Sequence, residues 1–354
     1  MLLRSLTADN FRNLASAEVA FHPRINILVG LNGQGKTNLL EAIYFLATTK
    51  SFRTARVASL FRFGSPSVFV SGALQREVEK TLSVGLEHGE SKKRVLLING
   101  ERTPLATYVS AMTVFAYSSA RLEILRGAPE ERRRFLDRGI ASVDPGYLEQ
   151  VSRYARVLRQ RNALLHSGTT AGLDAWDSEL AETAAVLQSA RAAYGEALTG
   201  AFNDIVAAHR YRVGNMVIAY RPSAVGDLKS MRREELRARM SLVGPQRDLL
   251  DFTVDGRTAS EVLSGGEMKM IVLFLKFAKL ELFRRRFDEA ALFLLDDVDA
   301  ELDLQILESL LAKMPPETQV FATSAKARFL QVLEASPHRR LTIENGAVTT
   351  AEDL

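Results

Sequence analysis

The sequence predicts an α/β fold built on a mixed sheet, with an antiparallel wing and an inserted helical lobe. An apolar run over 24–29 ends in a glycine-rich loop, and a helical pattern follows over 37–47. A second apolar run, over 292–295, ends in two aspartates. Between the two runs, apolar residues recur at helical spacing. Strands near both ends of the chain, with helices between them, favour one α/β head that a helical lobe interrupts.

Short alternating or apolar segments predict the strands of the head. Asn99-Gly100 follows one of them directly and is a strong signal for a two-residue hairpin turn. The N-terminal segments therefore predict a mixed layer with an antiparallel wing. The expected strands lie at 4–8, 17–21, 24–29, 68–70, 81–84, 95–98, 292–295 and 319–322.

The middle of the chain predicts an αα-hairpin, two helices joined by a short loop. The loop covers 166–172, and the second helix starts near Leu173. At about 20 residues the first helix would be about 30 Å long, which suits an arm or lid rather than a long coiled coil. The arginines of the first helix are expected largely on the faces away from its apolar stripe; they are Arg153, Arg156, Arg159 and Arg161.

This pattern divides the chain into three segments. Residues 1–140 and 241–354 are predicted to form the N-terminal and C-terminal parts of one head, and 141–240 the helical arm or lid lobe. The lobe explains why the two apolar strands with chemical motifs are separated by most of the chain.

Composition predicts a cytoplasmic protein and leaves its partner open. The chain has no cysteine, which excludes disulfides, thiolate zinc sites and a cysteine nucleophile. The first residues carry charge too early for a secretory segment, and the apolar run over 270–275 is too short for a membrane span, so we expect no membrane partner. The net charge of +4 does not by itself indicate nucleic acid. Arginine exceeds lysine roughly threefold, which phosphate binding and a GC-rich genome explain equally well.

A phosphate-binding loop is the clearest chemical signal. Residues 30–37 match GxxxxGK[ST], with an apolar strand before them and a helix after them. Backbone N–H groups of such a loop and the helix N-terminus bind phosphate oxygens. Lys36 is expected at the β- and γ-phosphates of ATP and Thr37 on Mg²⁺, the alternative being a glycine-rich turn without a ligand. The predicted nucleotide-binding residues here are Gly30, Leu31, Asn32, Gly33, Gln34, Gly35, Lys36 and Thr37.

The acidic end of the 292–295 strand is the expected partner of this loop. Alone it is a weak signal, because strands often end in aspartate at a turn. With the phosphate loop present, Asp296 is predicted to hold the metal, and Asp297 to polarise the attacking water.

Leu263-Ser264-Gly265-Gly266-Glu267 precedes an apolar-striped helix. Ser264 and Glu267 have the capping-box spacing, so an ordinary helix start is the alternative. The functional interpretation is a helix N-terminus whose serine hydroxyl and glycine N–H groups face a γ-phosphate. Its place in the sequence, between the phosphate loop and the acidic strand, is that of an ABC signature.

These motifs together resemble the ABC ATPases of the SMC-like branch, and across essentially the whole chain the RecF family of bacterial recombination mediators. The resemblance implies an ABC head with an inserted helical lobe, ATP-driven dimerisation, and slow, DNA-dependent ATP hydrolysis that releases the dimer. It also implies binding to duplex DNA without sequence preference, and leaves open whether junctions of single- and double-stranded DNA are preferred. It further implies that the protein works with RecO and RecR to load RecA at gapped DNA. The stretches that carry it are 9–14, 30–53, 127–137 and 243–248.

The resemblance also implies roles for single residues. Arg12 would contact the nucleotide, and Ser264, Gly265, Gly266 and Glu267 would act on ATP held by the other subunit. Thr323 is the switch position. The loop joining the two sites would contain Asp299, Glu301 and Asp303.

The chain departs from the family pattern at four places. Tyr117 to Leu122 stand where a Pro-Glu-Asp-Leu-like sensing loop is expected, and Gln246 replaces an expected histidine. Thr323-Ser324 offers no histidine at the switch, and Asp297 is shorter than the glutamate of ABC transporters. Slow turnover is consistent with these departures.

Two other function classes stay open from the residues. A monomeric P-loop phosphotransferase would share the phosphate loop, although the signature argues against it. An ATP-gated scaffold would need nucleotide binding without productive turnover. For DNA, the candidate contacts are arginine clusters, each of which is more often a solvated or salt-bridged face. They are Arg132 to Arg134, Arg153, Arg156, Arg159, Arg232, Arg233 and Arg284 to Arg286.

Overall fold

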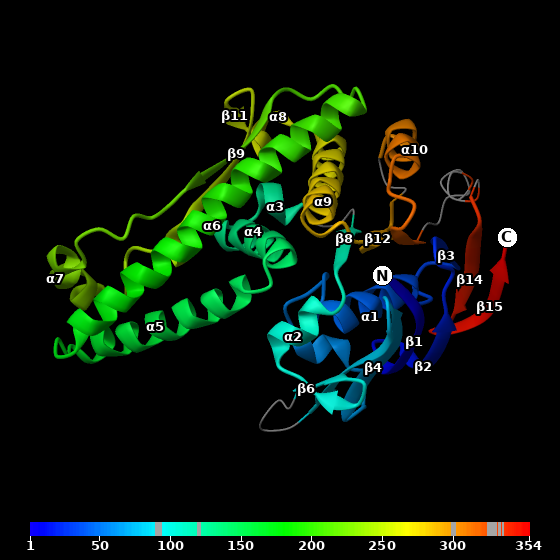
Figure 1. The fold of residues 1–354 in the computed structure, drawn as a ribbon, viewed down its shortest axis with the longest axis horizontal. Coiled ribbons are helices and arrows are strands. Elements are labelled where there is room, and N and C mark those ends of the chain that lie inside the picture. Colours follow the sequence, from blue (N-terminus) through cyan, green and yellow to red (C-terminus); the bar gives the residue numbers. More distant parts are fainter. Residues whose placement is uncertain (89–93, 119–121, 299–301, 324–330, 332–333, 335) are drawn as a thin grey trace. The chain divides into compact units, whose positions relative to one another are not determined.

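The computed structural model describes residues 1–88, 94–118, 122–298, 302–323, 331, 334 and 336–354 (Figure 1). The chain packs as two compact units. The first contains Met1–Arg121, Lys269–Lys276 and Phe283–Leu354, and the second Leu122–Met268 and Phe277–Leu282. Helix α9 (Gly265–Phe287) therefore contributes residues to both units. The domain boundaries expected after residues 140 and 240 stay a prediction.

The mixed sheet of the first unit has the order β15-β14-β3-β13-β12-β8. All neighbouring pairs are parallel except β14 with β15. Parallel strands end at the same edge of a sheet, so the carboxyl ends of β3, β12, β13 and β8 lie together. The strands are β3 (Ile25–Val29), β8 (Val114–Ser118), β12 (Leu292–Asp296), β13 (Gln319–Thr323), β14 (His338–Glu344) and β15 (Ala347–Asp353).

The second sheet of this unit is the antiparallel wing, with the order β2-β1-β4-β5-β6-β7. Asn99 and Gly100 have φ values of 53° and 81° in the tight turn between β6 and β7, as the hairpin signal predicted. The strands are β1 (Leu2–Phe11), β2 (Leu14–Ala20), β4 (Ser67–Gln75), β5 (Glu79–Glu87), β6 (Arg94–Ile98) and β7 (Glu101–Arg102).

Helix α1 (Lys36–Thr48) packs against strands of both sheets. Almost all of its residues are buried, and its apolar side chains join one core with β1, β4 and β5. The predicted α/β head with a mixed sheet and antiparallel wing is confirmed. The shorter helices of this unit are η1 (Val57–Leu60), α2 (Leu105–Ser110) and α10 (Leu304–Ala312).

The second unit contains the predicted αα-hairpin, α5 (Tyr147–Ser167) and α6 (Leu173–Ala208). The left-handed residue Gly168 ends α5 and accepts the required positive φ of 76°. A three-stranded antiparallel sheet, β9 (Met216–Arg221), β10 (Leu249–Val254) and β11 (Arg257–Thr258), completes the unit together with short helices. These are α3 (Glu123–Arg126), α4 (Pro129–Val143), α7 (Leu228–Ala238), η2 (Pro245–Arg247) and α8 (Ala259–Val262).

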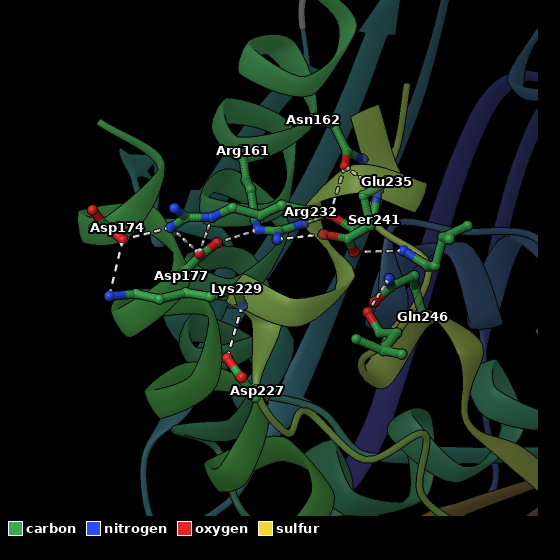
Figure 2. A network of polar contacts seen from close by, with 12 residues as sticks. Arg161, Asn162, Asp174, Asp177, Asp227, Lys229, Arg232, Glu235, Ser241 and Gln246 are labelled. Carbon is green, nitrogen blue, oxygen red and sulfur yellow. Dashed lines mark hydrogen bonds and ion pairs between the residues drawn. The ribbon is translucent and has the colours of Figure 1, made fainter. Parts of the chain in front are cut away.

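Arg161 corrects the expectation that the arginines of α5 lie away from its buried face. Its side chain is fully buried and donates to Asp177 on α6 (2.7 Å), Glu235 on α7 (2.6 Å) and Ser241 (2.8 Å). Figure 2 shows these side chains pointing toward one another. Position 161 continues the buried stripe of Tyr154 at helical spacing, so geometry places it inside, and the two carboxylates make burial of the charge tolerable.

Within the described part of the chain, no helix combines the length and apolar character that a transmembrane segment needs.

Candidate nucleotide site

The predicted phosphate loop joins the end of β3 to the start of α1. Gly30, Gly33 and Gly35 have positive φ values of 143°, 81° and 116°. A Cβ on Gly30 would lie 2.4 Å from the carbonyl oxygen of Ile343 on β14, so only glycine fits there. The loop therefore takes its shape from both its glycines and the neighbouring strand.

Lys36 folds back over this loop. Its Nζ donates to the carbonyl oxygens of Gly30 (2.7 Å) and Leu31 (2.9 Å). The ammonium group is thus held on the loop, where it can exchange these acceptors for phosphate oxygens. Leu31 itself is largely exposed, as expected for a residue that contributes only its backbone.

Asp296 lies at the centre of a group of hydroxyls. Thr37 Oγ1 donates to its Oδ1 at 2.7 Å, although 259 positions separate the two residues in the sequence. Thr323 Oγ1 donates to the same oxygen at 3.0 Å, and Ser118 Oγ to Oδ2 at 3.4 Å. Burial raises the pKa of Asp296, while the hydroxyl donors and the nearby charge of Arg53 counteract this rise. The structure thus brings the two predicted metal ligands, and the switch residue, into direct contact.

Asp297 follows at the end of β12, with its side chain exposed and a φ of 52°. Its backbone N–H donates to Thr323 Oγ1 at 2.9 Å. Thr323 therefore links both acids of the strand end. Within the described residues, no group of three or more histidine, aspartate or glutamate side chains could hold a metal, so a cation here would depend on Asp296, hydroxyls and the ligand's own oxygens.

The side chain of Arg12, a predicted nucleotide contact, pairs with a carboxylate of α1. Its Nε and Nη2 donate to the two carboxylate oxygens of Glu41 on α1, at 2.9 and 2.7 Å. Arg53 donates to Glu41 at 3.4 Å and to Asn38 Oδ1 at 2.8 Å. Sequence reasoning did not single out Arg53 or Glu41. The signal available was Glu41 itself, a charged residue within the apolar run of α1.

Gln34 is fastened to the turn between β14 and β15. Its carbonyl accepts from the Gly346 N–H (2.8 Å) and from Asn13 Nδ2 (3.2 Å), and its side chain accepts from the Asn345 N–H (2.5 Å). The turn between β14 and β15, close to the C-terminus, therefore supports the phosphate loop through hydrogen bonds. These contacts link residues from distant segments, and no local sequence pattern indicated them.

The signature residues belong to the second unit and form a reciprocal capping box. The Ser264 N–H donates to Glu267 Oε2 (2.8 Å), and the Glu267 N–H donates to Ser264 Oγ (3.3 Å). The pKa of Glu267 is lowered because its carboxylate accepts these hydrogen bonds. The hydroxyl of Ser264 acts as acceptor in the cap, so its own proton stays available to a phosphate. Hence the capping box and the signature function are compatible. Gly265 and Gly266 follow directly as the first residues of α9.

Of the predicted joining loop, Asp299 and Glu301 lie outside the described residues, as do Ser324 at the switch and Ser119 to Arg121 of the sensing segment. Asp303 caps α10 by accepting from the N–H groups of Gln305 and Ile306. Gln246, in the second unit, accepts from the Tyr154 hydroxyl and donates to the Val243 carbonyl (2.8 Å).

Several of the candidate DNA-binding arginines have polar partners within the second unit. Arg132 and Arg133 donate to backbone carbonyls of Leu250 (3.2 Å) and Asp248 (2.9 Å). Arg134 pairs with Glu130 and Glu131 of its own helix, Arg153 with Glu179 and Glu182, and Arg232 with Asp174 and Asp177. In the described part of the chain, Arg156 and Arg159 are exposed and have no ion pair. The partnered arginines thus contribute to the structure of the second unit, and the DNA contacts stay a prediction.

Comparisons with known proteins agree with this geometry. The model of the RecF/RecN/SMC N-terminal domain matches residues 2–349. The DNA replication and repair protein RecF of Geobacter sp. (strain M21) is 35% identical over 98% of this chain and all of its own length. The protein of the same name from Lactobacillus acidophilus is 35% identical over 92% of each chain.

Solved structures give the same result. The structure of the recombination mediator protein RecF-ATP in the RecFOR pathway covers 100% of this chain and 97% of its own, with a TM-score of 0.86 and 26% identity. An Smc head bound to the C-winged helix domain of ScpA has a TM-score of 0.58 at 15% identity, which shows a shared fold. Fold and loop define the chain as an ABC-type P-loop ATPase head of the RecF/RecN/SMC class. Within that class, the chain belongs to the RecF family.

Proposed function

We propose that this chain is an ATPase that clamps duplex DNA during recombinational repair. The observation that carries the proposal is the 2.7 Å hydrogen bond between Thr37, at the phosphate loop, and Asp296, at the end of β12. In P-loop ATPases, a hydroxyl and a carboxylate at these two places hold Mg²⁺ beside the phosphates of ATP. The structural relative described as RecF-ATP supports ATP as the ligand.

Each residue has a distinct task in this site. The N–H groups of Gly30 to Thr37 and the ammonium of Lys36 bind phosphate oxygens. Arg12, which Glu41 holds, contacts the nucleotide. Thr37 and Asp296 offer the oxygen ligands that suit Mg²⁺, which when bound would neutralise phosphate charge. The exposed Asp297 orients and polarises water, with its backbone fixed by Thr323.

The site is completed by a second copy. Ser264, Gly265, Gly266 and Glu267 act on ATP held by the other subunit, and Asp299 to Asp303 join the two sites. ATP binding thus forms the dimer on duplex DNA, and slow, DNA-dependent hydrolysis releases it. Because the relatives are DNA replication and repair proteins of the RecFOR pathway, we place RecR and RecO as partners, with RecA loading at gapped DNA as the outcome.

Lys36→Met tests the phosphate loop. It removes the ammonium group but keeps the length of the stem, so ATP affinity should fall by at least about tenfold, a loss of ~1.4 kcal/mol or more. Affinity is measured with a fluorescent ATP analogue, and ATP-dependent dimerisation by solution mass. Lys80→Met, on the exposed part of β5, is the matched control and should behave as wild type. Undiminished ATP-driven dimer formation by folded Lys36→Met protein would contradict the assignment.

A further inference from the structure

Glu41 is a buried carboxylate at the centre of a group of positive charges beside the phosphate loop. It lies on α1, one turn beyond the loop, and its side chain has 0% exposure. Both of its oxygens accept from Arg12, and one also accepts from Arg53. An uncompensated carboxylate in this position would be strongly disfavoured, so the arginines and Glu41 depend on each other.

The charge balance of this group favours an anionic ligand. Arg12 and Arg53 carry two positive charges, and Glu41 supplies one negative charge. The surplus positive charge lies where Arg53 is partly exposed, with 42% of its side chain accessible. Without Glu41, the two guanidinium groups would repel each other and turn to solvent.

Glu41 also holds the backbone that carries Arg53. Ser51 Oγ donates to Glu41 Oε1, and the same hydroxyl oxygen accepts from the N–H groups of Arg53 (2.9 Å) and Thr54 (3.0 Å). The carboxylate is therefore connected to Arg53 twice, through the guanidinium and through Ser51. This double connection fixes the direction in which Arg53 leaves the chain.

A chain of hydrogen bonds leads from Arg53 back to the phosphate loop. Arg53 Nη1 donates to Asn38 Oδ1 (2.8 Å), Asn38 Nδ2 donates to Asn13 Oδ1 (2.7 Å), and Asn13 Nδ2 donates to the Gln34 carbonyl (3.2 Å). Burial raises the pKa of Asp296, and the charge of Arg53 is one of the influences that oppose this rise. Arg53 is thus connected to the phosphate loop through the side chains of Asn38 and Asn13.

We propose that Glu41 is a positioning residue for nucleotide binding, which holds Arg12 and Arg53 at the phosphate loop so that their surplus charge meets the phosphates. The inference rests on the proposed ATP-binding function. Glu41 itself contacts no phosphate; it acts through the two arginines and through Ser51.

Glu41→Gln tests the inference, with the affinity for a fluorescent, non-hydrolysable ATP analogue as the readout. Glutamine keeps the size and one acceptor, but its amide N–H group opposes a guanidinium, so the affinity should fall by about tenfold or more. Glu18→Gln, on an exposed position of β2, is the matched control and should leave affinity unchanged. Wild-type affinity in a folded Glu41→Gln protein would overturn the inference.

A double-mutant cycle separates positioning from general support of the fold. If Glu41 acts through Arg53, then Glu41→Gln should cost much less affinity in an Arg53→Gln background than in the wild type. Fully additive losses in the cycles with Arg53→Gln and with Arg12→Gln would overturn the inference. If Glu41→Gln does not fold, Ser51→Ala carries the test: it breaks only the backbone connection and should weaken binding by about twofold to fivefold. An unchanged affinity in folded Ser51→Ala protein would then overturn the inference.

Lys36→Met in the same assay distinguishes the two levels of the proposal. If Lys36→Met loses affinity while Glu41→Gln binds as wild type, the inference about Glu41 fails and the ATP site stands. If the wild-type chain itself has no affinity for the analogue, the proposed function fails.

Discussion

Gly30 and Gly33 lie in the same phosphate loop, but the loop needs them for different reasons. Both have a positive φ, 143° and 81°, which other L-residues adopt only with strain. A Cβ on Gly33 would meet no atom within 4 Å, whereas one on Gly30 would meet the Ile343 carbonyl at 2.4 Å. At Gly30 the loop and β14 approach too closely for any side chain.

Replacement by alanine should therefore destabilise the protein to different extents at Gly30 and Gly33. Gly33→Ala should reduce the free energy of unfolding by about 1–3 kcal/mol, the cost of backbone strain. Gly30→Ala should cost clearly more, because β14 must also move away from the loop. Equilibrium urea unfolding of both variants measures the difference. Equal losses would show that the contact with Ile343 imposes no constraint.

At the scale of single residues, the sequence predicted the residues of the motifs better than the residues that contact them. The phosphate-loop pattern indicated Lys36 and Thr37, and the acidic strand end indicated Asp296, because these motifs have fixed local spacing. The partners Glu41 and Arg53 were not predicted. Their contact depends on the path of the chain between Thr49 and Arg53, which no local periodicity encodes.

Among the elements, α7 shows how polar side chains can fasten a helix. Its Glu235 is fully buried against Arg161 of α5, and its Arg232 pairs with Asp177 and Asp174 of α6 (Figure 2). Three helices thus meet around one buried guanidinium group. Such a network specifies a single arrangement of helices, because each charge needs its partner.

Arg161→Met should therefore destabilise the protein strongly. Methionine fills much of the space, but Asp177 and Glu235 lose their shared counter-ion, which costs about 3–5 kcal/mol for a buried pair. Arg156→Met, on the exposed face of the same helix, should change the free energy of unfolding by no more than about 0.5 kcal/mol. Chemical denaturation of the two variants checks this, and similar stabilities would contradict the interpretation of the network.

Elements with strong periodicity were predictable, and polar edge elements were not. The αα-hairpin and the strands β3, β12 and β13 follow from their apolar spacing, whereas β8 was not predicted. Sequence reasoning indicated no strand in the last residues, where β14 has only Leu341 and Ile343 as inward apolar residues and β15 is mostly exposed. The place of β14 beside β3 is set by long-range pairing, which the strand's own pattern does not determine.

For the whole molecule, the internal pairing of the arginine clusters changes where DNA contacts are expected. Arginines whose N–H groups already donate to carboxylates or carbonyls have fewer donors available for a DNA phosphate. We expect the proposed DNA binding to use a surface to which both subunits of the dimer contribute, so affinity should rise with ATP. It should also fall steeply with salt, since each phosphate contact releases counterions.

Duplex binding is measured by fluorescence anisotropy with random sequences at increasing salt. Between 50 and 200 mM salt we expect a loss of at least about tenfold in affinity, and tighter binding with ATP than without it. Comparing ATP with a non-hydrolysable analogue also separates the clamp from a scaffold, because only a clamp is released faster when hydrolysis proceeds. A DNA affinity that changes neither with salt nor with ATP would contradict the proposed clamp.

The last prediction concerns the proposed site shared between two subunits. Ser264→Arg places a bulky cation at the signature helix but leaves Lys36, Thr37 and Asp296 of the same subunit unchanged. The variant should bind ATP as a monomer and fail to dimerise, because the signature no longer fits the partner's γ-phosphate. Loss of the helix cap itself costs only about 1 kcal/mol, so the fold should survive. Ala171→Arg, which adds the same charge to an exposed loop of the second unit, is the control and should dimerise normally.

Mixing Ser264→Arg with Lys36→Met protein then tests complementation. A mixed dimer pairs one intact phosphate loop with one intact signature, so one of its two composite sites is whole and part of the ATPase activity should return. A monomeric phosphotransferase predicts no such recovery, because each of its sites lies within one chain. Solution mass with ATP and steady-state hydrolysis of the single and mixed samples are the measurements. Wild-type hydrolysis by Ser264→Arg alone, at concentrations too low for dimers, would rule out a site shared between subunits.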